Sequence, residues 1–340
     1  MTKSGLLCLL LTGLFVLALS TPPSTYAVQD PPDNTKKDKK DKKDKKDKQA
    51  RDQKPVLWRD PGNIEGLDLF AGPGGPGAAP DPRGKYTFES RSKSGTSEKI
   101  NVRDDKNQEW QVKFGAEARP APAAARIAWA AGYFVDQDYF VRDAHIEGRG
   151  GFDVWDVRFK RKDDGYKEED VWSWHSNPFM GTREFDGLKT LSALLNNWDM
   201  KTENNKVVRA KKKSGNDRDE LIYYVSDWGA TLGKTGSVFH EIPFLSSAPA
   251  GSKGDAVAYA TQTFITGVKD GKVVFNYKGK DKKAMEGVTV EHARWLGDLL
   301  GRLSDKQLSD AFRAGGFTDQ EIQTYTKALR DRINQLRNLK

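Results

Sequence analysis

Short runs in the first half of the chain alternate apolar and polar residues. A period of two is typical of strands with one buried face. Turn-forming residues separate the first three runs, which predicts three antiparallel strands, and three further β-like runs follow. The predicted strands span residues 86–90, 99–102, 109–114, 139–146, 155–160 and 171–174.

The second half of the chain follows a mostly helical pattern. One predicted helix runs up to an Asp-containing loop, and its apolar face consists of Leu188, Leu191, Leu194, Leu195 and Trp198. Two short β-like runs follow at 206–209 and 221–225. Capping boxes then predict the starts of two later helices: Ser304 with Gln307, and Thr318 with Glu321.

Residues 120–132 start with proline and end with glycine, which predicts one helix inside the strand-rich part. The fold class that follows is α+β. An antiparallel β-rich part with one helix is expected over 86–178, and a mostly helical part over 179–340. A chain of 340 residues with 36% hydrophobic content can bury a sizeable core, although not along its whole length.

The first 85 residues show neither period. Lys3 followed by the apolar run 6–19 predicts a secretory signal peptide over 1–27, and therefore export to the periplasm or beyond. An uncleaved anchor is the alternative, although the run is shorter than the roughly 20 residues of a membrane span. Residues 28–85, rich in Lys, Asp, Gly and Pro, are predicted to be a disordered tether.

Charge separates the tether from the rest of the chain. The formal net charge is +8, and the Lys/Asp tract at 36–48 holds nine lysines and four aspartates, a net +5. Little positive charge is left for the remainder, so no nucleic-acid partner is expected. Two roles stay open for the tract: a soluble spacer, or a weak contact with an anionic envelope surface.

The candidate chemistry lies at the end of the predicted helix. Asp199, Lys201 and Asn204 follow it, and Asp227 stands two residues before Gly229. Phosphoryl transfer to a hydroxyl needs a carboxylate that orients the attacking oxygen, oxygen ligands for Mg²⁺, and a cation for the charge in flight. Asp199 can be that carboxylate and Lys201 that cation, while Asn204 and Asp227 carry the hard oxygens that Mg²⁺ prefers.

The same residues carry a family resemblance. The stretch from Asp199 to Asn204 resembles the catalytic loop of the protein-kinase superfamily in its D-x-K-x-x-N form. Asp227-Trp228-Gly229 is similar to the metal-binding D-F-G element, in the D-W-G variant seen in aminoglycoside phosphotransferases. The resemblance implies a two-lobed fold, ATP and Mg²⁺ as cofactors, and a hydroxyl acceptor whose identity stays open. It assigns the four side chains the roles given above.

Two further elements extend the resemblance. The turn Ser94-Gly95-Thr96-Ser97 stands where the kinase Gly-rich loop cradles ATP phosphates, and an ordinary hairpin tip is the alternative. Lys113 stands in the third strand, where the family keeps the lysine that contacts the nucleotide phosphates; a solvated strand lysine is the alternative. The following helix has no acidic residue, so either Glu117 pairs with Lys113 from the loop or that ion pair is absent.

Other chemistries find little support. The sequence has no H-E-x-x-H pair, no G-x-S-x-G elbow and no G-x-x-x-x-G-K-[ST] loop. Cys8 is the only cysteine and lies in the predicted signal peptide, which excludes disulfides and thiol chemistry from the mature chain. The sequence therefore predicts an exported kinase-like phosphotransferase. The alternative is an inactive kinase fold or another envelope binding or structural protein of open oligomeric state.

Overall fold

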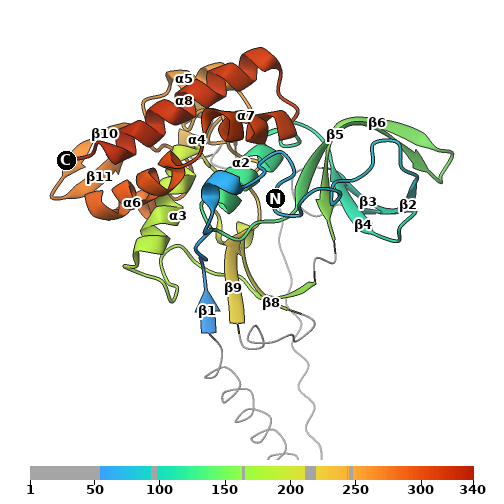
Figure 1. Ribbon diagram of the computed structural model, residues 1–340, viewed down its shortest axis with the longest axis horizontal. Helices are drawn as coiled ribbons and strands as arrows, with labels where there is room; N and C mark the ends of the chain where they lie inside the picture. Colours follow the sequence, from blue (N-terminus) through green and yellow to red (C-terminus); the bar gives the residue numbers. More distant parts are fainter. Residues whose placement is uncertain (1–53, 93–97, 163–164, 211–219, 243, 245–247) are drawn as a thin grey trace, which may run out of the picture. The chain divides into compact units, whose positions relative to one another are not determined.

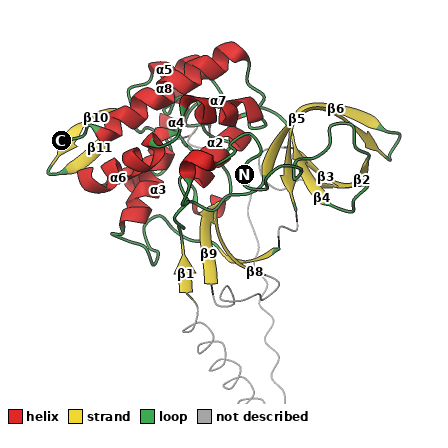
Figure 2. Cartoon of the chain, viewed as in Figure 1, coloured by secondary structure: helices red, strands yellow, loops and turns green. Residues whose placement is uncertain are grey.

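The computed structural model describes residues 54–92, 98–162, 165–210, 220–242, 244 and 248–340. The predicted signal peptide, the Lys/Asp tract and the turn Ser94–Ser97 lie outside these ranges. The described residues belong to one compact unit, which starts at Asp52. Helices and strands are both well represented within it (Figure 2).

Five strands close into a barrel (Figure 1): β2 (Tyr86–Ser92), β3 (Lys99–Asp104), β4 (Glu109–Lys113), β5 (Asp138–Glu147) and β6 (Phe152–Arg161). Their order is β2-β3-β4-β6-β5. The β2–β3, β3–β4, β4–β6 and β5–β6 pairs are antiparallel, and β2 closes the barrel by a parallel pairing that sets Tyr86 opposite Ile146. The five strands predicted between 86 and 160 are confirmed, whereas alternation along single strands did not reveal the closure.

A second sheet has the order β1-β9-β8-β7. Its strands are β7 (Tyr166–Asp170), β8 (Asn205–Ala210), β9 (Glu220–Val225) and β1 (Lys54–Val56), and β1 pairs in parallel with β9. The strand predicted at 171–174 is wrong, because β7 ends at Asp170. Trp172 and Trp174 instead bury their rings against Phe185. Aromatic residues favour strands mainly because strands bury them, and here a helix does so.

The part of the chain from Arg183 onward carries most of the described α-helices. They are α3 (Arg183–Leu194), α4 (Val238–Glu241), α5 (Ala256–Thr261), α6 (Val290–Gly301), α7 (Asp305–Ala314) and α8 (Asp319–Arg337). Short 3-10 turns lie at Ile64–Gly66, Thr202–Asn204 and Lys282–Met285, and a hairpin is formed by β10 (Ile265–Lys269) and β11 (Lys272–Phe275). Both predicted capping boxes, at Ser304 and Thr318, are confirmed.

Two large clusters of buried apolar side chains hold the unit together. One fills the barrel, with Val102, Val112 and Phe159 fully buried in it. The other joins the C-terminal helices to α2 (Pro120–Ala130), the helix between β4 and β5. Helix α2 packs on α7 through small residues, since a Cβ built on Gly315 would lie 3.1 Å from that of Ala123. The sequence assigns α2 to the N-terminal part of the fold. In the structure, α2 instead shares a hydrophobic core with the C-terminal helices.

Residues 54–85 pack onto the folded chain, so the tether prediction is wrong for this stretch. Leu57, Ile64 and Leu69 are buried in the core of the C-terminal helices. The Gln307 side-chain amide donates hydrogen bonds to the carbonyls of Ile64 (2.9 Å), Glu65 (3.1 Å) and Leu67 (3.0 Å). The Gly/Pro-rich run continues against the barrel, where a Cβ on Gly74 would overlap with the Tyr139 hydroxyl. Three widely spaced aliphatic residues produce no period that a sequence pattern can detect.

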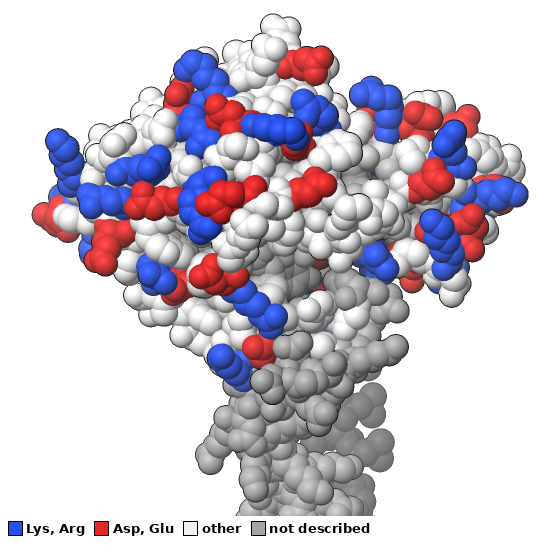
Figure 3. Space-filling model, in the orientation of Figure 1, with Lys and Arg blue, Asp and Glu red and all other residues white. Residues whose placement is uncertain are grey.

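The surface carries both signs of charge. On the face drawn in Figure 3, Lys and Arg alternate with Asp and Glu, and no single-sign region stands out. Ion pairs of the described residues include Lys306 with Asp310 (2.6 Å) and Arg302 with Glu65 (2.8 Å). Within the described ranges, no helix combines the length and the apolar character of a membrane-crossing segment.

Candidate active site

The predicted catalytic loop follows directly on α3. Thr182 caps this helix by accepting a hydrogen bond from the Phe185 amide (3.2 Å). After Leu194 the chain turns through Asn196, which has a left-handed φ of 54°. The Asn196 side chain holds this conformation by donating to the Gly233 carbonyl (2.6 Å) and accepting from Arg332 (3.2 Å).

Residues 226–232, which include Asp227, form hydrogen bonds with this loop, mostly through the backbone. The Trp198 amide donates to the Ala230 carbonyl (3.1 Å), and the Leu232 amide donates to the Leu195 carbonyl (2.9 Å). The Ser226 amide and hydroxyl both donate to the Asn204 carbonyl, at 2.8 and 3.2 Å. The two motifs that the sequence singled out therefore lie side by side, joined by hydrogen bonds at three points.

Asp199, Lys201 and Asn204 form one cluster. The Asn204 side-chain amide donates to the Asp199 carbonyl (2.8 Å), which fixes the loop between them. Lys201 Nζ lies 3.1 Å from one Asp199 carboxylate oxygen, and Lys280 Nζ lies 2.9 Å from the other. Burial alone would lower the pKa of Lys201, but the charge of Asp199 and its hydrogen bond raise it above the ordinary value. These three residues therefore lie together in the structure.

Asp227 faces the barrel. Its Oδ1 accepts a hydrogen bond from the Gly229 amide (3.0 Å), and its Oδ2 lies 3.5 Å from Lys113 Nζ. Arg158 Nη1 lies 3.8 Å from Oδ1. Burial would raise the pKa of this carboxyl, but the charges of Arg158 and Lys113 outweigh burial and hold it well below its usual range. The carboxylate is therefore ionised at neutral pH and is 30% exposed.

Lys113 is a buried lysine with two carboxylate partners. Besides Asp227, it pairs with Glu117, which lies in the loop between β4 and α2. Of the two alternatives open from the sequence, Glu117 pairing from the loop is the one observed. Glu117 also pairs with Lys253. Burial and the nearby Asp227 charge raise the pKa of Glu117, but Lys113 and Lys253 outweigh them, so it lies below the ordinary value.

Further charged residues, which the sequence patterns did not single out, surround the Lys113–Asp227 ion pair. Arg158 lies opposite Lys113 on the neighbouring strand β6, and its Nη1 is 3.4 Å from the Asp138 carboxylate. Two positions further along β6, Lys160 pairs with Asp136, which also accepts from the Tyr224 hydroxyl (3.1 Å). The two-residue spacing of Arg158 and Lys160 was the available signal, because residues two apart share one face of a strand.

The residues present fit a magnesium–nucleotide complex better than a metal cage made by protein alone. In the part of the chain that the structure describes, no three His, Cys, Asp or Glu side chains are grouped to hold a metal ion. Mg²⁺ in phosphoryl-transfer sites usually takes one or two protein oxygens, with phosphates and water completing its shell. Asp227 offers one carboxylate. Asn204 offers an amide oxygen, since its nitrogen donates to Asp199. The Ser94–Ser97 phosphate loop lies outside the described residues.

Comparison with known proteins identifies protein kinases among the similar solved structures. The proinflammatory kinase CtkA of Helicobacter pylori is 13% identical, with a TM-score of 0.44 over 75% of this chain and 97% of that one. The Rio2 kinase of Chaetomium thermophilum, solved as an ADP/Mg²⁺–phosphoaspartate complex, is 12% identical, with a TM-score of 0.30 over 73% and 72%. No protein-family model and no curated protein matches the chain. At these scores the assignment of function depends on this chain's own residues.

Proposed function

We propose that this chain is an exported kinase-like phosphotransferase, which binds ATP with Mg²⁺ and transfers a phosphoryl group to a hydroxyl acceptor. One observation carries the proposal. Lys113 from the barrel and Asp227 from the loop beside Asn204 form an ion pair at 3.5 Å, although 114 positions separate them. This pair sets a phosphate-binding cation next to a metal-binding carboxylate, as phosphoryl transfer requires.

Each residue of the site has a defined part in the proposed reaction. Lys113 holds the nucleotide phosphates, with Glu117 orienting its ammonium group. Asp227 and Asn204 hold the metal, which when bound neutralises phosphate charge. Asp199 orients the acceptor hydroxyl and takes up its proton as the oxygen attacks the γ-phosphorus and ADP leaves. Lys201, 3.1 Å from Asp199, neutralises the charge of the transferred group.

A second candidate function is an inactive kinase fold that serves as an envelope binding or structural protein. Both carboxylate oxygens of Asp199 are engaged by lysines, Lys201 and Lys280, and the acceptor hydroxyl would have to share them. The negative charge of Asp227 is likewise neutralised by its ion pairs with Lys113 and Arg158. Under either function, the Lys/Asp tract at 36–48 is proposed to act as a spacer or as a weak contact with an anionic surface.

The two candidates differ in turnover. The full chain is incubated with Mg²⁺ and γ-labelled ATP, and label is followed into the protein itself and into free phosphate. We expect slow transfer in the wild type and a loss of about 10²–10⁴-fold in Asp199→Asn, because that variant cannot accept the proton. Asp298→Asn, on the exposed face of α6, is the matched control and keeps the wild-type rate. Absence of transfer in a wild type that still binds Mg²⁺-ATP would support the inactive fold instead.

A further inference from the structure

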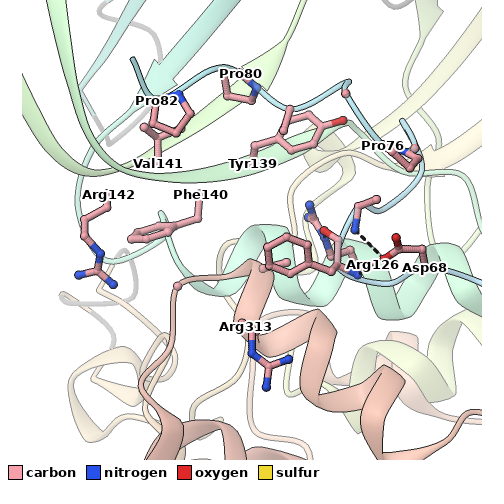
Figure 4. Close-up of a pocket in the computed structure, with 17 residues that line it drawn as sticks. Asp68, Pro76, Pro80, Pro82, Arg126, Tyr139, Phe140, Val141, Arg142 and Arg313 are labelled. Carbon is pink, nitrogen blue, oxygen red and sulfur yellow. Dashed lines mark hydrogen bonds between the residues drawn. The ribbon is translucent and has the colours of Figure 1, made fainter. Parts of the chain in front are cut away.

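A cavity of about 650 Å³ lies apart from the candidate active site (Figure 4). Its walls come from the Gly/Pro-rich run at 68–82, from β5, from α2 and from the turn that joins α7 to α8. None of Lys113, Asp199 and Asp227 lines it. Small-molecule sites in proteins usually measure about 300–1,000 Å³, so the volume suits a ligand of ordinary size.

The walls of the cavity are largely apolar. They include Phe70, Pro76, Pro80, Pro82, Phe140 and Val141. Phe70 is 55% exposed, which is high for so large an apolar side chain. Gly316, which also lines the cavity, approaches the Phe140 ring closely, since its φ is 73° and a Cβ there would overlap with the ring. The cavity therefore presents fixed aromatic surface to its interior.

The polar residues of the cavity are mostly cationic. Arg126, Arg142 and Arg313 line it together with a single acid, Asp68, which leaves a net of two positive charges. Figure 4 shows the three arginines at different sides of the space. The Asp68 carboxylate accepts from the amides of Phe70 (2.9 Å) and Ala71 (3.0 Å). Arg313 also pairs with Asp310, which lies outside the lining.

Arg126 is the buried member of this set. Its guanidinium donates to backbone carbonyls, those of Phe70 (3.3 Å), Pro122 (3.0 Å) and Asp138 (2.9 Å). Burial lowers its pKa to about 10, so the group stays charged at neutral pH. Its hydrogen-bond partners are neutral carbonyls, and the charges of Asp138 and Asp68 lie near enough to favour its protonated form.

Tyr139 adds an unused hydrogen-bonding group. Its side chain is 4% exposed, and its hydroxyl finds no hydrogen-bond partner within the described part of the chain. Figure 4 shows this hydroxyl directed toward the end of the space at Pro76. The oxygen itself is inaccessible and lies against Gly74, so the hydroxyl is enclosed by the protein and does not face a bound molecule.

We propose that this cavity binds a small organic anion, with an aromatic or aliphatic body and one carboxylate or phosphate group. The body packs against Phe140 and Phe70. The anionic group binds Arg142 or Arg313, the two exposed arginines of the lining. The Lys-rich tract of the chain itself carries the wrong sign of charge to occupy the site.

Calorimetric titration of the full chain with three matched probes tests this. The probes are 2-naphthoate, 2-naphthyl phosphate and the neutral 2-naphthamide. We expect either anion to bind about tenfold or more tightly than the amide, because charged hydrogen bonds replace neutral ones. The order of the two anions identifies the preferred group, and either order supports the proposal.

Variants locate the site. Arg142 and Arg313 are exposed, so Arg142→Ala/Arg313→Ala should fold normally and lose the preference for the anions. Arg91→Ala, an exposed arginine on β2, is the matched control and keeps it.

Three results would overturn the proposal. The neutral amide could bind as tightly as the anions, or the double variant could keep the wild-type preference. Inorganic phosphate could also bind as tightly as 2-naphthyl phosphate, which would remove the role of the apolar walls.

Discussion

Lys113 Nζ lies 3.5 Å from Asp227 Oδ2, and this ion pair joins strand β4 of the barrel to the loop that follows β9. Lys113 also pairs with Glu117, so one buried ammonium group serves two carboxylates. Asp227 in turn lies beside Ser226, whose amide and hydroxyl bind the Asn204 carbonyl. The pair thereby connects the barrel with the loop that holds Asp199.

Removing the lysine should destabilise the fold through the charges left behind. In Lys113→Met, Glu117, whose side chain is only 9% exposed, keeps Lys253 as its one remaining ion-pair partner among the described residues. Breaking a buried pair costs about 3–5 kcal/mol, and we expect the lower end here because Lys253 remains. Urea denaturation measures the free energy of unfolding. In Lys113→Met/Glu117→Gln, part of this loss should be recovered.

Lys99 provides the control for the double-mutant cycle of Lys113 and Glu117. Lys99 lies opposite Lys113 in register on β3, and it is not an ion-pair partner of Glu117 among the described residues. Lys99→Met should therefore cost much less than Lys113→Met. Strictly additive losses from Lys113→Met and Glu117→Gln would show that the pair contributes nothing to stability.

The lowered pKa values predict how stability depends on pH. Burial raises the pKa of Asp227, but Arg158 and Lys113 outweigh it, and the net pKa is lowered. A carboxyl with a lowered folded pKa stabilises the fold above its ordinary pKa, and this contribution is lost as pH falls through the folded value. We expect the free energy of unfolding to fall below about pH 4, and less steeply in Asp227→Asn. Equal acid slopes in the two proteins would contradict this assignment.

The packing of residues 54–85 can be tested at Ile64, which is 0% exposed in the core of the C-terminal helices. Ile64→Ala should lower the free energy of unfolding by about 2–5 kcal/mol, because it leaves a cavity in a packed core. The control is Val257→Ala, at a residue 69% exposed on α5, which should change it by about 0.5 kcal/mol or less. If the stretch were a tether, the Ile64 substitution would have as small an effect as the control.

Local sequence patterns predicted the helices and strands well where the alternation of apolar and polar residues continued over several residues or where a capping box marked a helix start. The alternation at 86–90 and 109–114 identified β2 and β4, and the capping boxes at Ser304 and Thr318 located the starts of α7 and α8. The parallel pairing of Tyr86 with Ile146 that closes the barrel left no such signal. It depends on the twist and register of the whole sheet, which no single strand encodes.

The same limit applies to the site. The loop from Asp199 to Asn204 was visible because its residues are close in sequence, and Asp227 because it stands in a short motif. Lys253 and Lys280 contact Glu117 and Asp199 from distant loops and belong to no local pattern. Composition is also a poor guide at 54–85, where Gly and Pro suggest a spacer although the run packs on the barrel and on α7.

Isothermal titration of the full chain with ATP, in the presence and absence of Mg²⁺, tests the central claim most directly. The account predicts Mg²⁺-dependent binding in the wild type, weaker binding in Lys113→Met, and loss of the Mg²⁺ dependence in Asp227→Asn. Binding that is equal in all three proteins, or no binding by the folded wild type at millimolar ATP, would contradict it.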